Sequence, residues 1–317
     1  MKIGILSSQV TDRLNPLVTM AEVVDEAITA ESHGFDHFWI VNSPWGMDAM
    51  TVASVAGQRT ERIELGTAVV PAFPRHPVTM AQQAITTNMA LNGRFTLGVG
   101  ASHQPIMEDE YHVDFKKPAR RMREYLEVLV PLCQGEHVDY SGEFFGANIS
   151  LRPPGFCPVE VMVAAMGPLM LETTGALARG TLPWLVNAER LEQVILPTIN
   201  AAAEAANKRA PRVAAILPVV ATDDIGKTKE LVHALLETGP KRESYEELKR
   251  QQGATSHADI AIIGNTSEVE ADLGHLKAIG LTDFIAAPLR VDETSYERTC
   301  EVLAGLRSSL VESHDFR

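Results

Sequence analysis

The feature that most constrains the fold is an alternation of short apolar segments with helix-like segments, repeated about eight times along the 317 residues. Most of the apolar segments are near-continuous hydrophobic runs, which is typical of parallel strands covered on both faces. Eight strand–helix units predict an α/β fold, a (β/α)8 TIM barrel, whereas a doubly wound open sheet normally uses fewer units. The expected strands are residues 2–6, 36–41, 62–70, 94–99, 159–165, 181–186, 213–221 and 282–287.

Capping residues predict where several helices begin. Asn15 before Pro16 predicts the start of the first helix, because Asn caps a helix well and Pro suits the first helical position. His76 with Pro77 predicts the start of the third helix in the same way. Residues 265–268, Asn-Thr-Ser-Glu, form a capping box that predicts a helix to about residue 279. Residues 224–252 are interpreted as a long, partly polar helical stretch.

Residues 135–158 interrupt the alternation between the fourth predicted helix and the fifth predicted strand. They contain several glycines and the run Pro-Pro-Gly at 153–155, with short strand-like pieces between them. These turn-forming residues predict an insertion built as a small hairpin. The remaining segments form a single set of strand–helix units, so residues 1–317 are interpreted as one domain.

Composition and charge exclude several classes of function. The chain has 28 Lys and Arg against 41 Asp and Glu, a net charge of −13, so neither a nucleic acid nor an anionic membrane is an expected partner. Three widely spaced Cys and the lack of a His–carboxylate motif predict no metal site. The first residues do not resemble a secretion signal, and no segment is long and apolar enough to span a membrane. A cytoplasmic location and a small-molecule substrate are therefore expected.

In a barrel of this kind the active site lies at the carboxyl ends of the strands. The residues directly after the predicted strands are therefore the candidates for function. They contain no nucleophile elbow and no Ser-His-Asp or Cys-His arrangement. The candidates are Ser7, Ser8, Asn42, Ser43, Trp45, residues 69–73, 100–104, 164–168 and 184–187, Thr222 and residues 288–290.

Two of these strand ends allow more than one interpretation. Gly98 and Gly100 let a flat ligand approach the backbone, or else they relieve crowding inside a tapering barrel. The dinucleotide pattern GxGxxG is not met, because position 103 is His. Residues 164–168, Ala-Ala-Met-Gly-Pro, predict a helix N-terminus whose free N–H groups suit a phosphate, or else an ordinary Gly-Pro helix start.

His103 is the one candidate for moving protons in the loop after the fourth strand. Histidine titrates near neutral pH, although a lone histidine is more often an ordinary hydrogen-bonding residue. The neighbouring acidic residues 108–110 could supply an acid or a base, but a solvated run of charge is the simpler interpretation.

Six collinear segments together carry a resemblance to a known family. They are AESHGFDHFWI (30–40), IELGTAVVPAFPRHPVTMAQQA (63–84), GRFTLGVGASHQ (93–104), PARRMREYLEVLVPLCQGEHVDYSGE (118–143), VMVAAMGPLMLETTGALARGT (161–181) and GLTDFIAAP (280–288). These segments resemble the luciferase-like monooxygenase superfamily, and in particular its oxidoreductases dependent on coenzyme F420, a deazaflavin. The resemblance implies hydride transfer between F420 and an unidentified organic substrate, in either direction. An FMN-dependent monooxygenase on the same fold is the alternative, and a barrel that binds the cofactor without catalysis is a third.

The resemblance also implies a set of site residues and a homodimer. A bulge in the third strand, with a non-proline cis peptide at Ala68-Val69, would support the back of the ring. His103 would transfer the proton or polarise the substrate. The other implied cofactor-binding residues are Val70, Gly100, Ala101, Ser102, Gln104, Ala164, Ala165, Met166, Gly167 and Pro168, and the implied substrate pocket is Asn42, Ser43, Trp45, Phe73 and Trp184.

The chain departs from better-known members of the superfamily at two positions. The Asp-His pair that often follows the second strand is replaced by Asn42-Ser43, and the acidic residue of sugar-phosphate members is replaced by His103. Lys and Arg are also scarce at the strand ends, with Arg290 the exception. These departures argue against a sugar-phosphate substrate.

Overall fold

Eight parallel strands close into a barrel in the computed structural model, which describes residues 1–8, 18–237, 243–292 and 294–312. Each strand pairs with the next one around the ring, and pairing of β12 with β1 and of β10 with β9 completes the closure. The predicted (β/α)8 TIM barrel is therefore confirmed. The strands are β1 (Lys2–Leu6), β2 (His37–Ile40), β3 (Glu64–Thr67), β5 (Phe95–Gly100), β8 (Glu160–Val163), β9 (Gly180–Thr181), β10 (Arg212–Ala221) and β12 (Asp283–Pro288).

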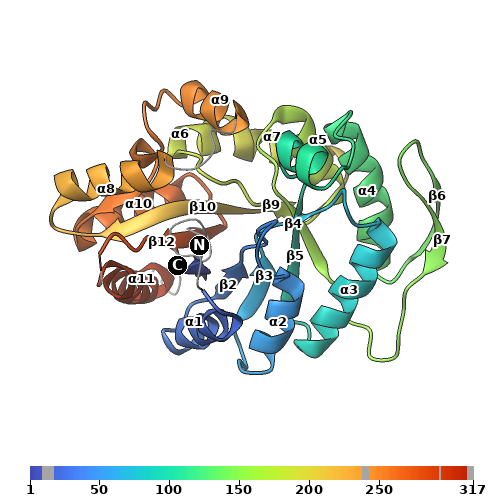
Figure 1. Ribbon diagram of the computed structural model, residues 1–317, viewed down its shortest axis with the longest axis horizontal. Coiled ribbons are helices and arrows are strands. Elements are labelled where there is room, and N and C mark those ends of the chain that lie inside the picture. The colour runs from blue at the N-terminus through green and yellow to red at the C-terminus, as the bar shows by residue number, and fades with distance from the viewer. Residues whose placement is uncertain (9–17, 238–242, 293, 313–317) are drawn as a thin grey trace.

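Helices surround the strands on the outside of the barrel (Figure 1). None of the described helices is long and apolar enough to cross a membrane. The helices are α1 (Met20–Ser32), α2 (Ala49–Gly57), α3 (Pro77–Ala90), α4 (Pro118–Cys133), α5 (Pro168–Leu177), α6 (Ala188–Arg190), α7 (Leu196–Ala205), α8 (Ile225–Glu237), α9 (Glu243–Gln251), α10 (Thr266–Ala278) and α11 (Ser295–Glu312).

The capping signals place two of three predicted helix starts correctly. His76 caps α3, with its Nδ1 accepting from the Val78 N–H, and Asn265 forms the predicted capping box at the start of α10. The first helix instead begins at Met20, where Thr19 is the capping residue. Asn15 and Pro16 lie outside the described residues.

Side chains along each strand point alternately into the barrel interior and outward to the helices, and so contribute to two apolar layers. Along β10, Ala214 and Ile216 face the barrel interior with Leu6, Trp39 and other small or apolar side chains. The intervening residues of the strand belong instead to the larger cluster that packs against the helices. The interior is thus filled by side chains and leaves the ends of the barrel as the places where chemistry can occur.

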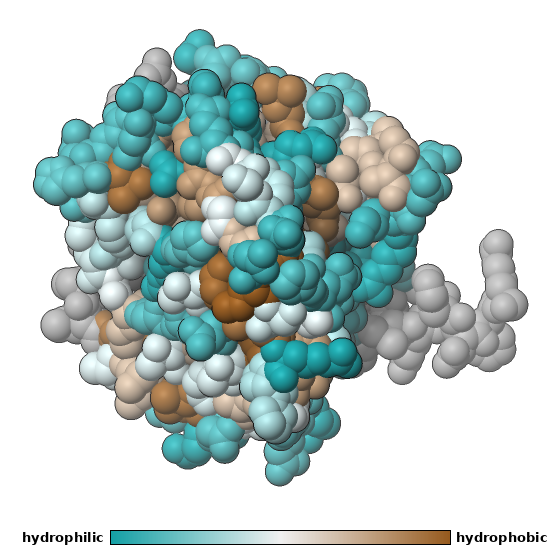
Figure 2. Space-filling view, turned by 90° about the vertical axis from the view of Figure 1, so that its right-hand side faces the viewer, coloured by the Kyte–Doolittle hydropathy of each residue, from teal (hydrophilic) through white to brown (hydrophobic). Residues whose placement is uncertain are grey.

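The predicted insertion is a two-stranded antiparallel hairpin of β6 (His137–Ser141) and β7 (Gly146–Ser150). It lies on the outer side of α4, at the right of Figure 1. On the face that carries this hairpin, hydrophilic side chains predominate around a small hydrophobic area (Figure 2). The hairpin is therefore an addition to the outside of the barrel.

The segment after β10 differs most from the sequence prediction. The long helical stretch expected over 224–252 is two helices, α8 and α9, and a further strand, β11 (Ile262–Gly264), pairs with the end of β10. The sixth predicted strand, residues 181–186, is also shorter, because only Gly180–Thr181 form a ladder and Trp184 adds a single bridge to Ile216. The described residues between β10 and β11, 222–237 and 243–261, thus belong to a long excursion from the carboxyl end of β10.

A buried ion-pair network closes the amino end of the barrel. Arg212 Nη1 lies 2.7 Å from Glu64 Oε1, and Arg212 Nη2 lies 2.6 Å from Asp283 Oδ1. His37 Nε2 lies 3.5 Å from the same Asp283 oxygen. Burial by itself would raise the pKa of Asp283, but His37 and Arg212 outweigh it and hold the pKa well below its ordinary value. The sequence analysis did not identify this network.

Replacing Arg212 with Ala is expected to lower the free energy of unfolding by about 3–5 kcal/mol, because the buried Asp283 and the partly buried Glu64 lose their cation. Urea unfolding at pH 7 measures this, with Arg209→Ala as the control, since the Arg209 side chain is 67% exposed. The carboxylate pKa values are depressed by folding, so the contribution is present at neutral pH and is lost as the pH falls through the acidic range. Equal stability of the two variants at pH 7 would contradict the prediction.

Candidate active site

The third barrel strand carries a one-residue bulge at its carboxyl end. β3 pairs with β5 at an offset of 30 residues, as in the pair Leu65–Phe95. The following short strand, β4 (Val70–Pro71), pairs with β5 at an offset of 29, as in Val70–Val99. One extra residue therefore lies between the two ladders, and the predicted bulge is confirmed.

The bulge contains the expected cis peptide bond, between Ala68 and Val69. Thr67 occupies the interruption in the ladder: its Oγ1 donates to the Gly98 carbonyl at 2.8 Å and accepts from the Gly98 N–H at 2.9 Å. The side chain of Thr67 therefore replaces the backbone pairing that the bulge removes.

The bulge forms part of the carboxyl end of the barrel interior. Most members of the interior apolar cluster are fully buried, but four that pack against it are only partly buried: Val41, Ala68, Val69 and Trp184. All four follow the carboxyl ends of barrel strands. We call them the mouth floor, because they form an apolar surface at the end of the barrel where active sites of this fold lie.

The two glycines of β5 are required by close packing. A Cβ on Gly98 would lie 2.0 Å from the Thr67 carbonyl oxygen, and a Cβ on Gly100 would lie 2.8 Å from Val69 Cγ2 and 3.3 Å from Ala164 Cβ. The interpretation that these glycines relieve crowding is thus the one that the structure supports. Gly100 also brings the bulge and the end of β8 together.

The segment after β8 ends in an exposed helix N-terminus. Gly167 is the N-cap of α5 and provides no side-chain hydrogen bond, and a Cβ built on it would meet nothing within 4 Å. The first N–H groups of a helix have no partner within the helix. The Gly-Pro start of α5 therefore presents free donors beside the mouth floor. Ala165, by contrast, is buried and bonds through its backbone to Thr181 Oγ1.

Arg190 is a cation beside this turn that the sequence analysis missed. It ends the short helix α6 after β9, and its Nη2 lies 3.5 Å from the Met166 carbonyl oxygen. Its Nε is buried and has no hydrogen-bond partner in the described part of the chain. A guanidinium beside a helix N-terminus suits an anion. An Arg a few residues after a strand end was the available signal.

His103 lies in the loop after β5, where it meets a residue from a distant segment. Its ring and the ring of Tyr245 in α9 are in edge-to-face contact, with centroids 5.0 Å apart. Ser102, just before it, has a φ of 65°, in the left-handed region. α9 is held at this end of the barrel by Gln252, whose side chain bonds to Leu185 and Asn187. The excursion after β10 therefore covers part of the mouth.

The loop after β5 also contacts the loop after β2. Trp45 is 53% exposed, and its indole Nε1 donates to Glu110 Oε2 at 2.5 Å. Gln104 donates to Glu108 at 2.9 Å within the same loop. Glu108, Asp109 and Glu110 are exposed, so the solvated interpretation of this run is supported, with Glu110 also fixing Trp45.

Asn42 and Ser43 have local structural contacts. Asn42 Oδ1 accepts from the Ala49 N–H at 3.1 Å, and Ser43 Oγ accepts from the Trp45 N–H at 3.3 Å. Both side chains are partly exposed after β2. They therefore shape the loop that carries Trp45.

Phe73, which the sequence analysis expects in the substrate pocket, is almost fully buried. It is 4% exposed and packs against Phe115, with the Arg121 guanidinium 4.5 Å from its ring centroid. Arg121 also stacks near Phe144 and Phe145 of the hairpin. Phe73 thus belongs to an aromatic cluster that packs the hairpin against the barrel. These contacts join residues far apart in the chain, so the sequence alone does not predict them.

One group of candidate metal ligands occurs among the described residues. Glu237, Glu246 and His257 bring one ligand atom each within 4.8 Å of one another. Lys249 Nζ already lies 2.9 Å from Glu246 and 3.5 Å from Glu237. The ammonium group supplies the positive charge here, so we assign no metal to this group.

The chain belongs to the luciferase-like monooxygenase family, whose model matches residues 1–286. A curated relative, the F420-dependent glucose-6-phosphate dehydrogenase of Nocardia farcinica, is 35% identical over 176 residues, which are 50% of this chain and 52% of the relative. The chain thus matches about half the length of that relative.

Two solved structures share the fold at low sequence identity. The coenzyme F420-dependent tetrahydromethanopterin reductase of Methanopyrus kandleri has a TM-score of 0.73 at 21% identity, with 96% of each chain covered. The oxygenating constituent of 3,6-diketocamphane monooxygenase from Pseudomonas putida, solved with FMN, has a TM-score of 0.73 at 17% identity, with 98% of each chain covered.

Gly100→Ala is expected to destabilise the protein by about 1–3 kcal/mol, because its methyl group would overlap Val69. Gly274→Ala in α10 is the matched control, since nothing lies within 4 Å of its Cβ position and alanine favours a helix. Gly167→Ala is not used, because Gly167 is the N-cap of α5, where alanine is unfavourable. Thermal unfolding of both variants measures the difference. An unchanged melting temperature for Gly100→Ala would show that the bulge and β8 are not tightly packed there.

Proposed function

We propose that this protein is an oxidoreductase that binds coenzyme F420 at the carboxyl end of the barrel and transfers a hydride between it and an organic substrate. The observation that carries the proposal is the juxtaposition of an apolar floor with an anion-binding turn. Gly100 brings Val69 of the bulge close to Ala164, and three residues later the chain starts α5 beside Arg190. A planar ring with a phosphorylated side chain needs both features.

The residues present fit such a cofactor. Ala68, Val69 and Val70 would support the ring from behind, and residues 100–104 would border its edge. The backbone N–H groups of Gly167 and of the residues after Pro168 would receive the phosphate, with Ala164, Ala165 and Met166 leading into the turn and Pro168 starting the helix. The buried, unpartnered Nε of Arg190 is a polar atom that such an anion would satisfy. When bound, F420 supplies the hydride chemistry, and the protein supplies orientation and electrostatics.

His103 is proposed as the residue that donates or accepts the proton at the substrate. It is partly exposed after β5, and its ring is in edge-to-face contact with Tyr245. Trp184 of the mouth floor, with Trp45, Asn42 and Ser43 in the loop after β2, would border the substrate. These side chains exclude water while the imidazole moves the proton.

F420 is favoured over FMN by sequence similarity. The relative named as F420-dependent is 35% identical to this chain, whereas the FMN complex resembles it at 17% identity, where the likeness concerns the fold alone. An FMN-dependent monooxygenase remains the second candidate because the same barrel serves both. Oxygen separates them, since reduced FMN reacts with oxygen readily and the reduced deazaflavin does so poorly.

The protein is expected to bind F420 tightly and FMN weakly, as measured by fluorescence titration. Arg190→Ala should weaken F420 binding roughly tenfold, the effect of losing about 1.4 kcal/mol. The deazariboflavin that lacks the phosphate should bind the variant and the parent equally, and Arg209→Ala is the control variant. Tight FMN binding without deazaflavin binding, together with oxygen consumption, would contradict the F420 proposal and support an FMN-dependent monooxygenase.

His103→Ala is expected to lower kcat by about 10²- to 10⁴-fold with any accepted substrate, because the proton step loses its positioned group. The dissociation constant of F420 should change little. Stopped-flow absorbance measures kcat, and fluorescence titration measures the dissociation constant of F420. Binding without turnover on any substrate, by parent and variant alike, would support a cofactor carrier instead of an enzyme.

The cytoplasmic location, the homodimer and a small-molecule substrate with no nucleic acid or membrane as partner remain predictions from the sequence and the resemblance. Size-exclusion chromatography with light scattering would test the homodimer.

A further inference from the structure

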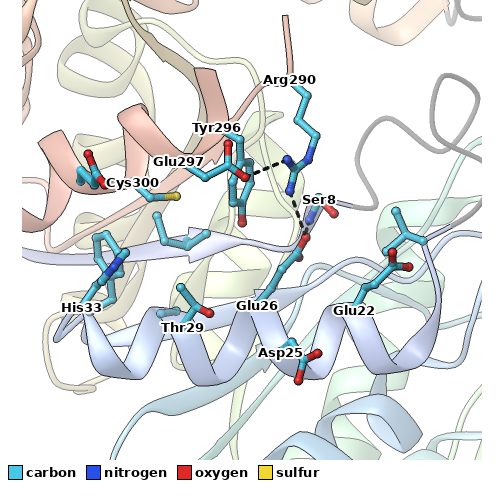
Figure 3. Close-up of a pocket in the computed structure, with 15 residues that line it drawn as sticks. Ser8, Glu22, Asp25, Glu26, Thr29, His33, Arg290, Tyr296, Glu297 and Cys300 are labelled. Carbon is cyan, nitrogen blue, oxygen red and sulfur yellow. Dashed lines mark hydrogen bonds and ion pairs between the residues drawn. The ribbon is translucent and has the colours of Figure 1, made fainter. Parts of the chain in front are cut away.

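The cation expected at the end of the last strand is directed away from the barrel mouth. Arg290 follows β12, and its guanidinium lies 4.1 Å from the ring centroid of Tyr296 and 3.1 Å from Glu297 Oε1, both in α11. Its other Nη lies 3.9 Å from Glu26 in α1. Figure 3 shows the side chain between these two carboxylates.

These carboxylates belong to a cavity of about 680 Å³ outside the barrel, between α1 and α11. Its floor includes Ile5 and Phe35, which belong to the outer apolar layer. Five acidic residues line it against the one arginine. They are Glu22, Asp25, Glu26, Glu297 and Glu301. The surplus of negative charge stabilises the Arg290 guanidinium in this cavity.

Two other arginines lie near strand ends. Arg75, after β4, lies 2.6 Å from Asp48 and 3.0 Å from the amide oxygen of Gln83. Arg190 lies at the turn proposed for the cofactor phosphate. In the described ranges, the side chains placed at the mouth are instead the apolar floor, the His103–Tyr245 pair and the exposed acidic residues 108–110.

We infer that the substrate is an uncharged, largely apolar molecule, and that the site rejects anions such as phosphate esters and carboxylates. The inference rests on the proposed function and specifies its substrate class. Among the described residues, the mouth floor and the His103–Tyr245 pair offer an anion no cation, so an anion would lose hydration there without compensation, and it would pass the acidic residues 108–110. An apolar molecule would instead gain contact with Val41, Trp184 and the Tyr245 ring.

The reaction balances for an uncharged enone or ketone. One carbon of the unsaturated bond receives the hydride with its two electrons, and the oxygen or the neighbouring carbon receives a proton by way of His103. The deazaflavin is oxidised by two electrons in this direction, and the reverse direction oxidises the corresponding uncharged alcohol.

The test compares matched ligands on the F420-loaded protein at pH 7.5. The probes are cyclohex-2-en-1-one and cyclohexanone, each beside its ring-carboxylate derivative, with glucose 6-phosphate as a further anion. Calorimetry measures binding, and deazaflavin absorbance measures turnover. We expect the neutral member of each pair to bind at least tenfold more tightly, with no binding of glucose 6-phosphate. Equal or tighter binding of the anions, or binding of no probe at all, would overturn the inference.

Variants test the contribution of the mouth floor to binding separately from that of Arg290. Trp184→Ala should weaken binding of the neutral probes at least tenfold, and Trp184→Phe should restore most of it, which guards against a folding defect. Arg290→Ala should leave the preference for neutral probes unchanged. If Arg290→Ala abolishes binding of an anion, the arginine serves the mouth and the inference is wrong. Failure of F420 to bind in the initial titration would instead reject the proposed function.

Discussion

Closure of the parallel sheet is the constraint on which the rest of the structure depends. Once β12 pairs with β1 and β10 pairs with β9, every barrel strand has two neighbours and alternate side chains must point inward. The interior is then filled by side chains such as Trp39, Met162 and Ile216. A ligand has no room within the barrel and can meet it only at an open end.

The two ends of the barrel have opposite chemistry. The amino end is closed by Arg212 with Glu64 and Asp283, whose charges satisfy one another in a buried setting. The carboxyl end has an apolar floor that includes Val69 and Trp184 and is bordered by free helix donors and loops. The ion-pair network thus lies at the end opposite the proposed ligand site, so changes at the mouth would leave this network intact.

Packing of the outer helices decides where the Arg290 guanidinium lies, although the sequence places this residue directly after a barrel strand. Arg290 follows a barrel strand, yet α1 and α11 surround its guanidinium with carboxylates outside the barrel. Arg290 is held outside the barrel, whereas the excursion after β10 brings a side chain to the mouth. Its Tyr245 contacts His103, which lies 142 positions earlier in the chain. The character of the mouth is therefore decided by elements that are not themselves part of the barrel.

The sequence by itself determined the order of strands and helices, the hairpin insertion and several helix caps, because periodicity and capping depend on residues close together in the chain. The resemblance supplied the bulge and its cis bond at Ala68-Val69. Only the tertiary structure decided that Phe73 is buried under Arg121, that Arg190 lies beside Met166 and that Tyr245 meets His103. These contacts join residues far apart in the chain, and their geometry is set by closure of the barrel and packing of its loops, which no local pattern records.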